Sequence, residues 1–363
     1  MKINIKAHSG NYSIYIGKNI AIKLNKFLSL NKIKSNKIVF VQDKNVPNKI
    51  VNKIIQTFKT RDVKLIKINF SEKSKTIKTV LKINNLLSKN NFSRKDCLVA
   101  IGGGICGDVC GFAASIFKRG LKFVNIPTTL LAQVDSSIGG KTGVNSSTGK
   151  NMIGSFYQPN LVISDLVFLD TLNKKQIICG YAEILKHAII RNRNFLNFLI
   201  KNLKEIISKK QIPLKKAIYE SCMIKKRIVE KDEKESSLRK SLNFGHTFGH
   251  AFESSKKYSK NFNHGEAVIL GIFCATMFSF NKKILNEKDL NIIINHLEQI
   301  GYNSIKSYVS KNMLNKIVSY MINDKKNIDG KINLILLKRI SKPIINRSFS
   351  SKEVSLFLKK LVY

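Results

Sequence analysis

The sequence predicts an α/β protein with two domains, a parallel sheet covered by helices and then a mostly helical domain. Its 363 residues are long enough for two domains. In the first half, short runs rich in Ile and Val alternate with helical patterns. In the second half, long amphipathic patterns dominate. Alternating strands and helices are typical of a parallel sheet with helices on both faces.

Five apolar runs in the first half predict buried strands. They cover residues 38–43, 64–70, 97–104, 123–129 and 161–165. Most of them end in Gly, Pro, Asp or Thr, which mark strand ends. Two segments between them, 46–58 and 74–90, carry apolar residues at helical spacing. The first 17 residues alternate apolar and polar side chains, as an exposed strand does.

The second half predicts helices from about Thr171 to residue 330. Residues 173–210 and 213–252 are the longest amphipathic stretches. A short strand at 332–338 and a helix at 351–362 close the chain. We therefore predict one domain over residues 1–170 and a second over residues 171–363.

Charge is the strongest feature of the composition, with 64 basic and 23 acidic residues and a net charge of +41. Such an excess can indicate nucleic-acid binding. Here it is spread along the chain together with abundant Asn and Ile, which favours a compositional bias of the genome. The chain shows neither an apolar run long enough to span a membrane nor a signal peptide, and we expect it in the cytoplasm. The six cysteines lie among apolar residues and are expected to be buried, reduced thiols.

Residues 101–112, IGGGICGDVCGF, place three glycines after a predicted strand and before a helix expected near Gly107. Glycines let the backbone approach a phosphate closely, and a helix N-terminus offers N–H donors to it. The spacing differs from the usual dinucleotide pattern GxGxxG, so a plain tight turn is the alternative.

Two further segments hold polar residues in unusual surroundings. Residues 127–159 form a long stretch rich in Gly, Ser and Thr, which is either an ordered wall of a site or a solvated loop. Residues 180–190 place Glu183, Lys186 and His187 on one face of a helix. Taken alone, that face is as well explained by a surface ion pair.

Residues 243–267, NFGHTFGHAFESSKKYSKNFNHGEA, contain three of the six histidines. His246 and His250 lie one helical turn apart, and His264 begins another predicted helix. Two histidines and one carboxylate with an open position make a catalytic zinc site. From the residues alone, the three histidines, or a pair of them with Glu183 or Glu266, are all possible ligand sets.

Taken together, the motifs resemble the 3-dehydroquinate synthase family of sugar phosphate cyclases. The resemblance is carried by SEKSKT (71–76), GGGICGDVCGFAASIFKRG (102–120), IPTTLLAQVDSSIGGKTGVN (126–145), GKNMIGSFYQP (149–159), GYAEILKH (180–187), LNFGHTFGHAFE (242–253), HGEAV (264–268) and DKK (324–326). They occur in the family's order and at its spacing over roughly residues 1–340.

The resemblance implies a Rossmann-like NAD-binding α/β domain at 1–170, a helical zinc- and substrate-binding domain at 171–363, and an active site in the cleft between them. It also implies that Zn²⁺, or Co²⁺, is held by Glu183, His246 and His264. His250 would then contact substrate or relay protons.

The family converts 3-deoxy-D-arabino-heptulosonate 7-phosphate to 3-dehydroquinate and phosphate, a step of the shikimate pathway to chorismate and the aromatic amino acids. The implied sequence is oxidation at C5 by NAD⁺, loss of phosphate, reduction at C5, ring opening and an intramolecular aldol reaction. The anionic sugar phosphate substrate requires a cationic cradle.

Family positions carry the expected contacts onto this chain. The catalytic and substrate contacts fall on Asp135, Lys141, Asn151, Lys186, Lys225, Arg239, Asn243, His250, Lys325 (less well Lys326) and Arg119. The NAD contacts fall on Glu72, Lys75, Gly104, Ile105, Cys106, Gly107, Asp108, Thr128, Thr129, Lys141, Lys150, Phe168, Leu169, Asp170 and Thr171. Arg119 matches a contact made from the neighbouring subunit of a homodimer, and Asp43 is a candidate for the adenosine ribose.

Three alternative functions remain. A sister cyclase would make an inosose or a valiolone from another sugar phosphate, but the predicted carboxylate contacts Lys141, Arg239, Asn243 and Lys325 favour the dehydroquinate reaction. A metal-dependent polyol dehydrogenase would release NADH and would not need the phosphate cradle. A nucleic-acid-binding protein is suggested by charge alone, and neither a basic stripe nor a known binding motif supports it.

Overall fold

The computed structural model describes residues 1–58, 62–147, 149–256, 262–301, 304–323 and 331–362. It divides into two compact units. The first unit comprises Met1–Ile177 and Ser208–Glu233, and the second comprises Ile178–Ile207 and Lys234–Tyr363. The predicted boundary at 170 and 171 lies close to the first crossing, but one later segment returns to the first unit. That segment contains helix α8 (Gln211–Val229).

The first unit is built on a sheet of seven strands in the order β4-β3-β5-β6-β9-β2-β1. The strands are β1 (Lys2–Ala7), β2 (Gly10–Gly17), β3 (Lys37–Asp43), β4 (Asp62–Ile68), β5 (Cys97–Gly102), β6 (Lys122–Pro127) and β9 (Leu161–Asp165). Neighbouring strands are parallel except for β1 and β2, which are antiparallel. The five predicted strands are confirmed. The alternating N-terminal segment is a hairpin of two strands.

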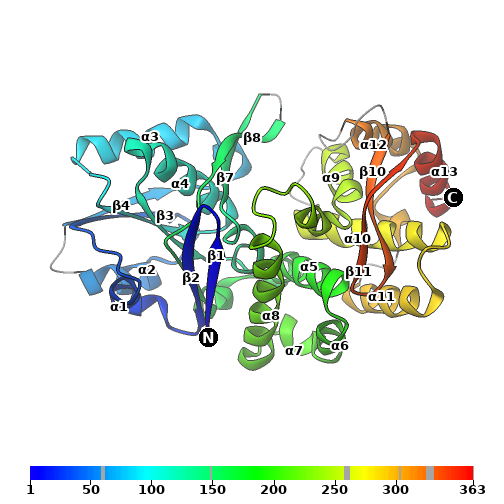
Figure 1. Cartoon of the computed structure of the whole chain (residues 1–363), viewed down its shortest axis with the longest axis horizontal. Coiled ribbons are helices and arrows are strands. Elements are labelled where there is room, and N and C mark those ends of the chain that lie inside the picture. Colours follow the sequence, from blue (N-terminus) through cyan, green and yellow to red (C-terminus); the bar gives the residue numbers. More distant parts are fainter. Residues whose placement is uncertain (59–61, 148, 257–261, 302–303, 324–330, 363) are drawn as a thin grey trace. The chain divides into compact units, whose positions relative to one another are not determined.

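Helices cover both faces of this sheet (Figure 1). On one face, α3 (Ile77–Lys89) and α4 (Gly104–Ile116) pack Val80 and Val109 into a core with Val39 and Leu98. On the other face, α1 (Leu24–Leu30) and α2 (Asn48–Ile55) form a second apolar core with the sheet. Strands buried on both faces are uniformly apolar, which explains why the continuous Ile and Val runs were recognisable.

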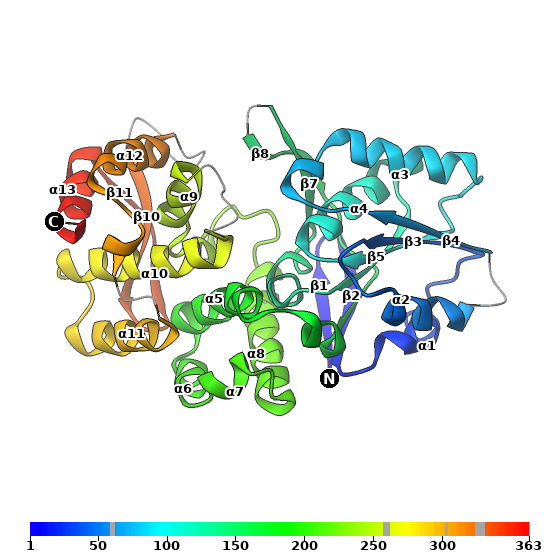
Figure 2. The ribbon, with the colours of Figure 1, turned by 180° about the vertical axis from the view of Figure 1, so that it is seen from behind.

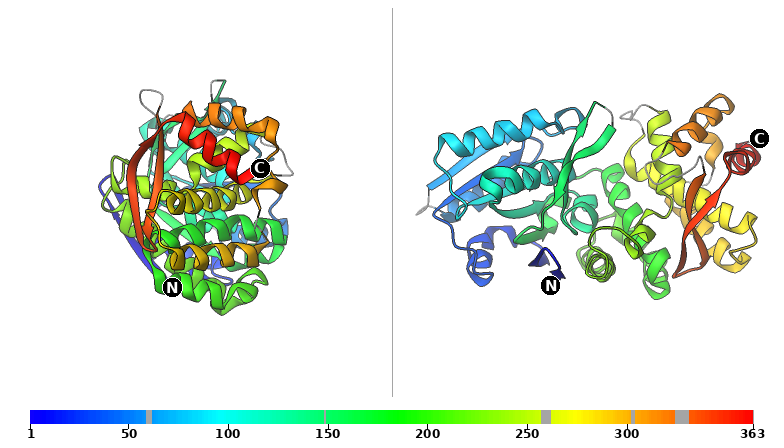
Figure 3. Two further views of the ribbon diagram at one scale, coloured as in Figure 1. Left: turned by 90° about the vertical axis from the view of Figure 1, so that its right-hand side faces the viewer. Right: turned by 45° about the horizontal axis from the view of Figure 1, so that its top comes forward.

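The remaining elements of the first unit are short. They are η1 (Ala21–Lys23), η2 (Gln56–Phe58), η3 (Glu72–Ser74), η4 (Phe117–Arg119), η5 (Ala132–Ser136, a π-helix), β7 (Lys141–Ser146), β8 (Gly149–Phe156) and η6 (Leu166–Thr171). β7 and β8 pair as an antiparallel hairpin that extends from the unit (Figure 3). The polar segment 127–159 is therefore largely ordered, and Gly111 lets α4 approach Thr142 of this hairpin closely.

The second unit is mostly helical (Figure 2). Its elements are α5 (Lys174–Arg191, which begins in the first unit), α6 (Arg193–Lys201), α7 (Leu203–Ile207), η7 (Leu238–Asn243), α9 (His246–Ser255), α10 (His264–Asn281), α11 (Glu287–Ile300), η8 (Ile305–Ser307), η9 (Lys311–Met313), α12 (Leu314–Ile322), β10 (Ile332–Arg339), β11 (Lys342–Phe349) and α13 (Ser351–Val362). The predicted strand near the C-terminus is one arm of a hairpin, because β11 pairs with β10. β11 was not predicted.

Glycines let α9 and α10 approach each other closely. A Cβ on Gly271 would lie 2.0 Å from the backbone oxygen of Gly245, and Gly245 itself has a φ of +79°. Gly245 directly precedes His246, so the close crossing fixes the first residue of α9. α10 begins with a capping box, in which Asn263 and Glu266 satisfy each other's backbone N–H groups.

No disulfide links the six cysteines, all of which lie in the described residues; Cys179 is half-buried and the others are buried. Within the described ranges, every helix is too short or too polar to cross a lipid bilayer.

Candidate functional site

The glycine-rich turn of the first unit joins β5 to α4 at the point where the chain reverses direction across the sheet. β3 and β5 are neighbours in the sheet. The chain runs outward from β3 to β4 in one direction and from β5 to β6 in the opposite direction. In open α/β sheets, ligands bind at the carboxyl ends of the two strands that flank such a reversal. Asp43 ends β3, and a Cβ on Gly102 would lie 3.1 Å from the Cβ of Asp43. Burial raises the pKa of the Asp43 carboxyl, although hydrogen bonds from Asn45 oppose this.

The start of α4 is suited to an anion. The helix begins at Gly104, earlier than the predicted start near Gly107, and no side chain of the described residues caps its N-terminus. Its first N–H groups therefore need acceptors from a ligand or from water. A Cβ on Gly104 would lie 2.9 Å from the Ser136 hydroxyl, so the turn depends on a residue without a side chain. Ile105 and Gly107 belong to the same turn, whereas the Cys106 side chain is buried.

A buried lysine connects three of the predicted site segments. Lys75 is 5% exposed, and its Nζ donates to Oδ2 of Asp108 at 2.6 Å and to Oδ1 of Asn151 at 2.5 Å. Burial raises the pKa of Asp108, and Lys75 opposes that shift. Asn151 has a left-handed φ of 54°, which such a specific contact can stabilise. Lys75 thus holds the start of α4 against the β7–β8 hairpin.

The other predicted NAD contacts vary in their surroundings. Glu72 accepts a hydrogen bond from Nδ2 of Asn145 at 2.8 Å and lies 3.6 Å from Nζ of Lys150. Thr128 is buried beside the turn, and its N–H donates to the oxygen of Gly102 at 2.9 Å. Within η6, the Phe168 and Leu169 side chains are buried, so they can reach a ligand only through the backbone. The η6 residues Asp170 and Thr171 are exposed.

Asp135 and Lys225, both predicted substrate contacts, form an ion pair. Nζ of Lys225 lies 2.5 Å from Oδ1 of Asp135 and 2.5 Å from its backbone oxygen. Lys225 comes from α8, the helix that returns to the first unit. Lys141, at the start of β7, and Arg119 are exposed. Arg119 has a φ of 66°, in a turn of residues with positive φ.

In the second unit, Glu183, His246 and His264 come together from three helices. One ligand atom of each lies within 4.8 Å of the others, a spacing that fits one metal ion. Oε1 of Glu183 lies 3.4 Å from Nε2 of His246 and 3.6 Å from Nε2 of His264. Both oxygens of Glu183 are buried. Lys186 forms an ion pair with Oε2, which leaves Oε1 directed at the histidines.

The electrostatics of this cluster favour an anionic glutamate. Burial alone would raise the pKa of Glu183, but Lys186 and the two histidines hold it well below its usual range. Burial and the charge of Lys186 lower the pKa of His246. Burial also lowers the pKa of His264, yet the carboxylates of Glu183 and Glu253 outweigh it and raise that pKa well above its usual range. Deprotonated Glu and neutral His are the forms that bind a metal.

The two alternative ligands stand apart from this cluster. The His250 ring is exposed, and its centre lies 5.1 Å from that of His246 and 6.3 Å from that of His264. Oε2 of Glu266 accepts a hydrogen bond from the N–H of Asn263 at 2.7 Å and so caps α10. The geometry therefore favours Glu183 as the carboxylate ligand, while the role of His250 stays a prediction.

The remaining predicted substrate contacts of the second unit lie near η7. Arg239 is buried there, and Asn243 donates from Nδ2 to Oε1 of Glu235 at 2.7 Å. Glu235 was not predicted from the sequence, because it lies in a charged segment with no motif of its own. Lys325 and Lys326 lie outside the described residues. Glu253 was also missed as an individual residue, although it ends a motif that carries the family resemblance.

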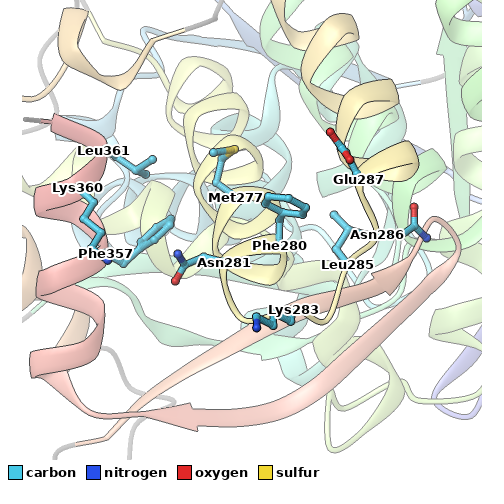
Figure 4. Close-up of a pocket in the computed structure, with 10 residues that line it drawn as sticks. All are labelled: Met277, Phe280, Asn281, Lys283, Leu285, Asn286, Glu287, Phe357, Lys360 and Leu361. Carbon is cyan, nitrogen blue, oxygen red and sulfur yellow. The ribbon is translucent and has the colours of Figure 1, made fainter.

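A separate pocket opens on the second unit between α10, the start of α11 and α13 (Figure 4). Its lining includes Met277 and Phe280 of α10 and Phe357 and Leu361 of α13. Among the residues that the structure describes, no predicted ligand or substrate contact lines it. We therefore assign the candidate site by the chemistry of the histidine cluster and not by this pocket.

Comparison with known proteins identifies similar sequences over nearly the whole chain. The family model for the 3-dehydroquinate synthase N-terminal region matches residues 65–179, and that for the C-terminal region matches residues 180–327. The 3-dehydroquinate synthase of Pelagibacter ubique is 53% identical over 361 residues, covering 99% of this chain and 98% of the relative. That of Dictyoglomus thermophilum is 43% identical over 295 residues, covering 81% and 82%.

Solved structures share the fold at low identity. A 2-deoxy-scyllo-inosose synthase complexed with carbaglucose-6-phosphate, NAD⁺ and Co²⁺ has a TM-score of 0.89 at 23% identity, covering 99% of this chain and 100% of that one. A 2-epi-5-epi-valiolone synthase from Streptomyces hygroscopicus, with NAD⁺ and Zn²⁺ bound, has a TM-score of 0.84 at 22% identity, covering 96% of both. A probable glycerol dehydrogenase from Sinorhizobium meliloti has a TM-score of 0.67 at 11% identity, covering 96% of both.

Proposed function

Because this chain belongs to the 3-dehydroquinate synthase family, we propose that it converts 3-deoxy-D-arabino-heptulosonate 7-phosphate to 3-dehydroquinate and phosphate. The reaction is a phosphate-eliminating carbon–oxygen lyase reaction of the shikimate pathway. The observation that carries the proposal is the cluster of Glu183, His246 and His264, whose ligand atoms lie within 4.8 Å of one another, in a member of this family.

Glu183, His246 and His264 are the proposed ligands of a divalent metal, Zn²⁺ or Co²⁺. The donor set of one carboxylate and two imidazoles suits zinc and leaves a coordination position open for substrate. The burial of both Glu183 oxygens, with Oε1 within 3.4 Å of His246 Nε2 and 3.6 Å of His264 Nε2, supports the assignment. Lys186 keeps this carboxylate ionised, so Glu183 has no proton to lose before metal binds. His264, whose pKa is raised, would release one as the metal binds.

NAD⁺ is the second proposed cofactor. The uncapped start of α4 would receive its phosphates, and Asp108 and Lys75 would contact it near the same turn. When bound, the metal supplies a Lewis acid for substrate oxygen atoms, and NAD⁺ supplies a hydride acceptor for oxidation at C5. The tight turn at Gly102 and Gly104 supports this role, since a Cβ at either position would collide with a neighbouring side chain.

The cationic and polar side chains at the matching family positions are the proposed substrate contacts. In the first unit they are Asp135, Lys141, Asn151 and Lys225, and in the second unit Lys186, Arg239, Asn243 and His250. The lysines and the arginine would bind the carboxylate and phosphate of the substrate. Lys225 also orients Asp135 through its two contacts with that residue.

A homodimer and a cytoplasmic location complete the proposal. The family resemblance assigns Arg119 to the phosphate site of the neighbouring subunit. Its exposure and its left-handed backbone conformation are compatible with a contact outside its own subunit. Mass measurement of the native protein would test the homodimer, and mixed dimers carrying Arg119→Ala would test the role of Arg119 in the neighbouring subunit.

The test is phosphate release from 3-deoxy-D-arabino-heptulosonate 7-phosphate with NAD⁺, before and after chelation and zinc addition, while the absorbance of NADH is followed. We expect release that needs both metal and NAD⁺, with no net NADH, because the cofactor is reduced and reoxidised within one turnover. Net NADH without phosphate would indicate a polyol dehydrogenase. Turnover of a different sugar phosphate alone would indicate a sister cyclase, a class that shares this fold.

A further inference from the structure

We infer that Glu253 is a positioning residue for the metal site, because its carboxylate fixes the orientation of the His264 ring. The inference rests on the proposed metal role of Glu183, His246 and His264, and it assigns a function to a residue outside that ligand set. Glu253 lies on α9, and His264 is the first residue of α10.

The two nitrogens of His264 face different carboxylates. Nδ1 lies 3.3 Å from Oε2 of Glu253, within hydrogen-bond distance. Nε2 lies 3.6 Å from Oε1 of Glu183, in the candidate metal cluster. The imidazole therefore bridges the orienting carboxylate and the ligand carboxylate.

This arrangement selects one tautomer of the ring. An ionised carboxylate has no hydrogen to donate, so Nδ1 of His264 must carry the proton. In the neutral ring, the form that binds a metal, Nε2 then keeps its lone pair for the metal. A carboxylate that accepts from the second nitrogen of a metal-binding histidine also fixes the plane of the ring and raises its basicity.

The position of Glu253 on α9 explains how this helix supplies two residues to the site. Glu253 follows the ligand His246 by seven residues, which is close to two turns, so both side chains lie on the same side of α9. Its burial, at 8% exposed, removes much of the competition from water for its oxygens.

His246 and His264 differ in whether a carboxylate contacts the Nδ1 atom of the ring. Nδ1 of His246 is buried and has no hydrogen-bond partner among the described residues. His246 is instead fixed by its place at the start of α9, next to the close crossing at Gly245. Loss of Glu253 should therefore weaken metal binding by His264 more than metal binding by His246.

The test compares E253Q with E266Q in the full-length protein. Both residues are 8% exposed, and both changes remove one negative charge. Glu266 caps α10, and Gln also serves in a capping box, so E266Q preserves that helix start. Gln at position 253 can donate to Nδ1 as well as accept, so it no longer enforces the tautomer.

Three measurements are made on each variant. Competition with a chromophoric chelator gives the zinc affinity, and the visible spectrum of the Co²⁺ form reports ligand geometry. Thermal unfolding of the metal-free form shows whether the fold is intact. We expect zinc affinity to fall roughly 10- to 100-fold in E253Q. We also expect its Co²⁺ spectrum to change while the metal-free melting temperature changes little. E266Q should retain the wild-type affinity and spectrum.

Equal zinc affinities for the wild type and E253Q, or equal losses in E253Q and E266Q, would overturn the inference and leave the proposed function intact. A wild-type protein that binds zinc with the same affinity as its His246→Ala variant would overturn the proposed metal site itself. Should E253Q fail to fold, E253D carries the test. It keeps the charge but withdraws the carboxylate by one methylene, and the inference requires it to bind zinc more weakly than wild type.

Discussion

Lys225 contacts Asp135 twice, with its ammonium nitrogen 2.5 Å from Oδ1 and 2.5 Å from the backbone oxygen of a residue 90 positions earlier. Lys225 is 5% exposed and the Asp135 side chain is 30% exposed, so the lysine of this ion pair is shielded from solvent. The contact attaches α8 to η5 and explains why the segment Ser208–Glu233 belongs to the first unit.

Replacing Lys225 with Met should destabilise the protein by about 1–3 kcal/mol, because Asp135 loses a charged partner and its carbonyl loses a donor. Denaturant unfolding measures this loss. The neighbouring Lys226→Met is the control. The Lys226 side chain is more exposed than that of Lys225 and lies 3.8 Å from Glu230, so its replacement should cost less than about 1 kcal/mol. Equal losses in the two variants would contradict the importance of the buried contact.

Gly265→Ala should separate α10 from α5 and weaken metal binding. A Cβ at Gly265 would lie 2.2 Å from the Cα of Cys179, which precedes Glu183 by four residues on α5. Backbone atoms cannot move aside as a side chain can, so we expect a cost of about 1–3 kcal/mol. The zinc affinity should fall several-fold, as measured by chelator competition.

Gly301→Ala is the matched control for that prediction. Gly301 has a φ of +94°, but its Cβ would meet no atom of the described residues within 4 Å. The change should cost about 1 kcal/mol through backbone strain and should not alter zinc affinity. A loss of zinc affinity in Gly301→Ala as large as that in Gly265→Ala would show that general destabilisation, and not helix separation, is responsible.

Lys75→Met should destabilise the protein more at neutral pH than in acid. The pKa of Asp108 is raised by burial above its ordinary value of 3.8, and Lys75 opposes that rise. An acid with a raised pKa in the folded state costs stability as the pH rises through that pKa. Without Lys75 the pKa rises further, so the extra cost grows with pH and reaches about 1–3 kcal/mol near pH 7.5.

Urea unfolding of wild type and Lys75→Met at pH 4.5 and pH 7.5 measures this effect, with a smaller difference expected at pH 4.5. Lys64→Met is the control, since Lys64 lies 3.8 Å from Asp62 in an exposed pair. Lys64→Met should lower the free energy of unfolding by less than about 1 kcal/mol at both pH values. A difference for Lys75→Met that is independent of pH would argue against the coupling to Asp108.

Zinc should stabilise the folded protein by a free energy that grows with the logarithm of the ratio of free zinc to the dissociation constant. At a free concentration 100 times that constant, the expected gain is about 2.7 kcal/mol, and a chelator should reverse it. Calorimetric melting with and without zinc measures the gain. His246→Ala should lose it, whereas His8→Ala, which removes an exposed histidine of the first unit, should retain it. Retention of the full gain by His246→Ala would exclude the proposed cluster.

The sequence by itself determined the parts of the fold that depend on local pattern. The strands β3, β5, β6 and β9 are buried on both faces, so their runs of Ile and Val were recognisable without any partner. The glycine turn before α4 was recognisable because few other residues tolerate such close packing at Gly102 and Gly104. The helical character of the second unit followed from its 3.6-residue periodicity.

Tertiary structure decided which distant residues meet. From the residues alone, Glu183 and Glu266 were equal candidates for the carboxylate ligand. In the structure Glu183 lies beside His246 and His264, whereas Glu266 caps α10. The return of α8 to the first unit and the contact between Glu253 and His264 carry no periodic signal. Local patterns specify helices and strands because each residue there interacts with near neighbours, whereas these contacts depend on packing between segments far apart in the chain.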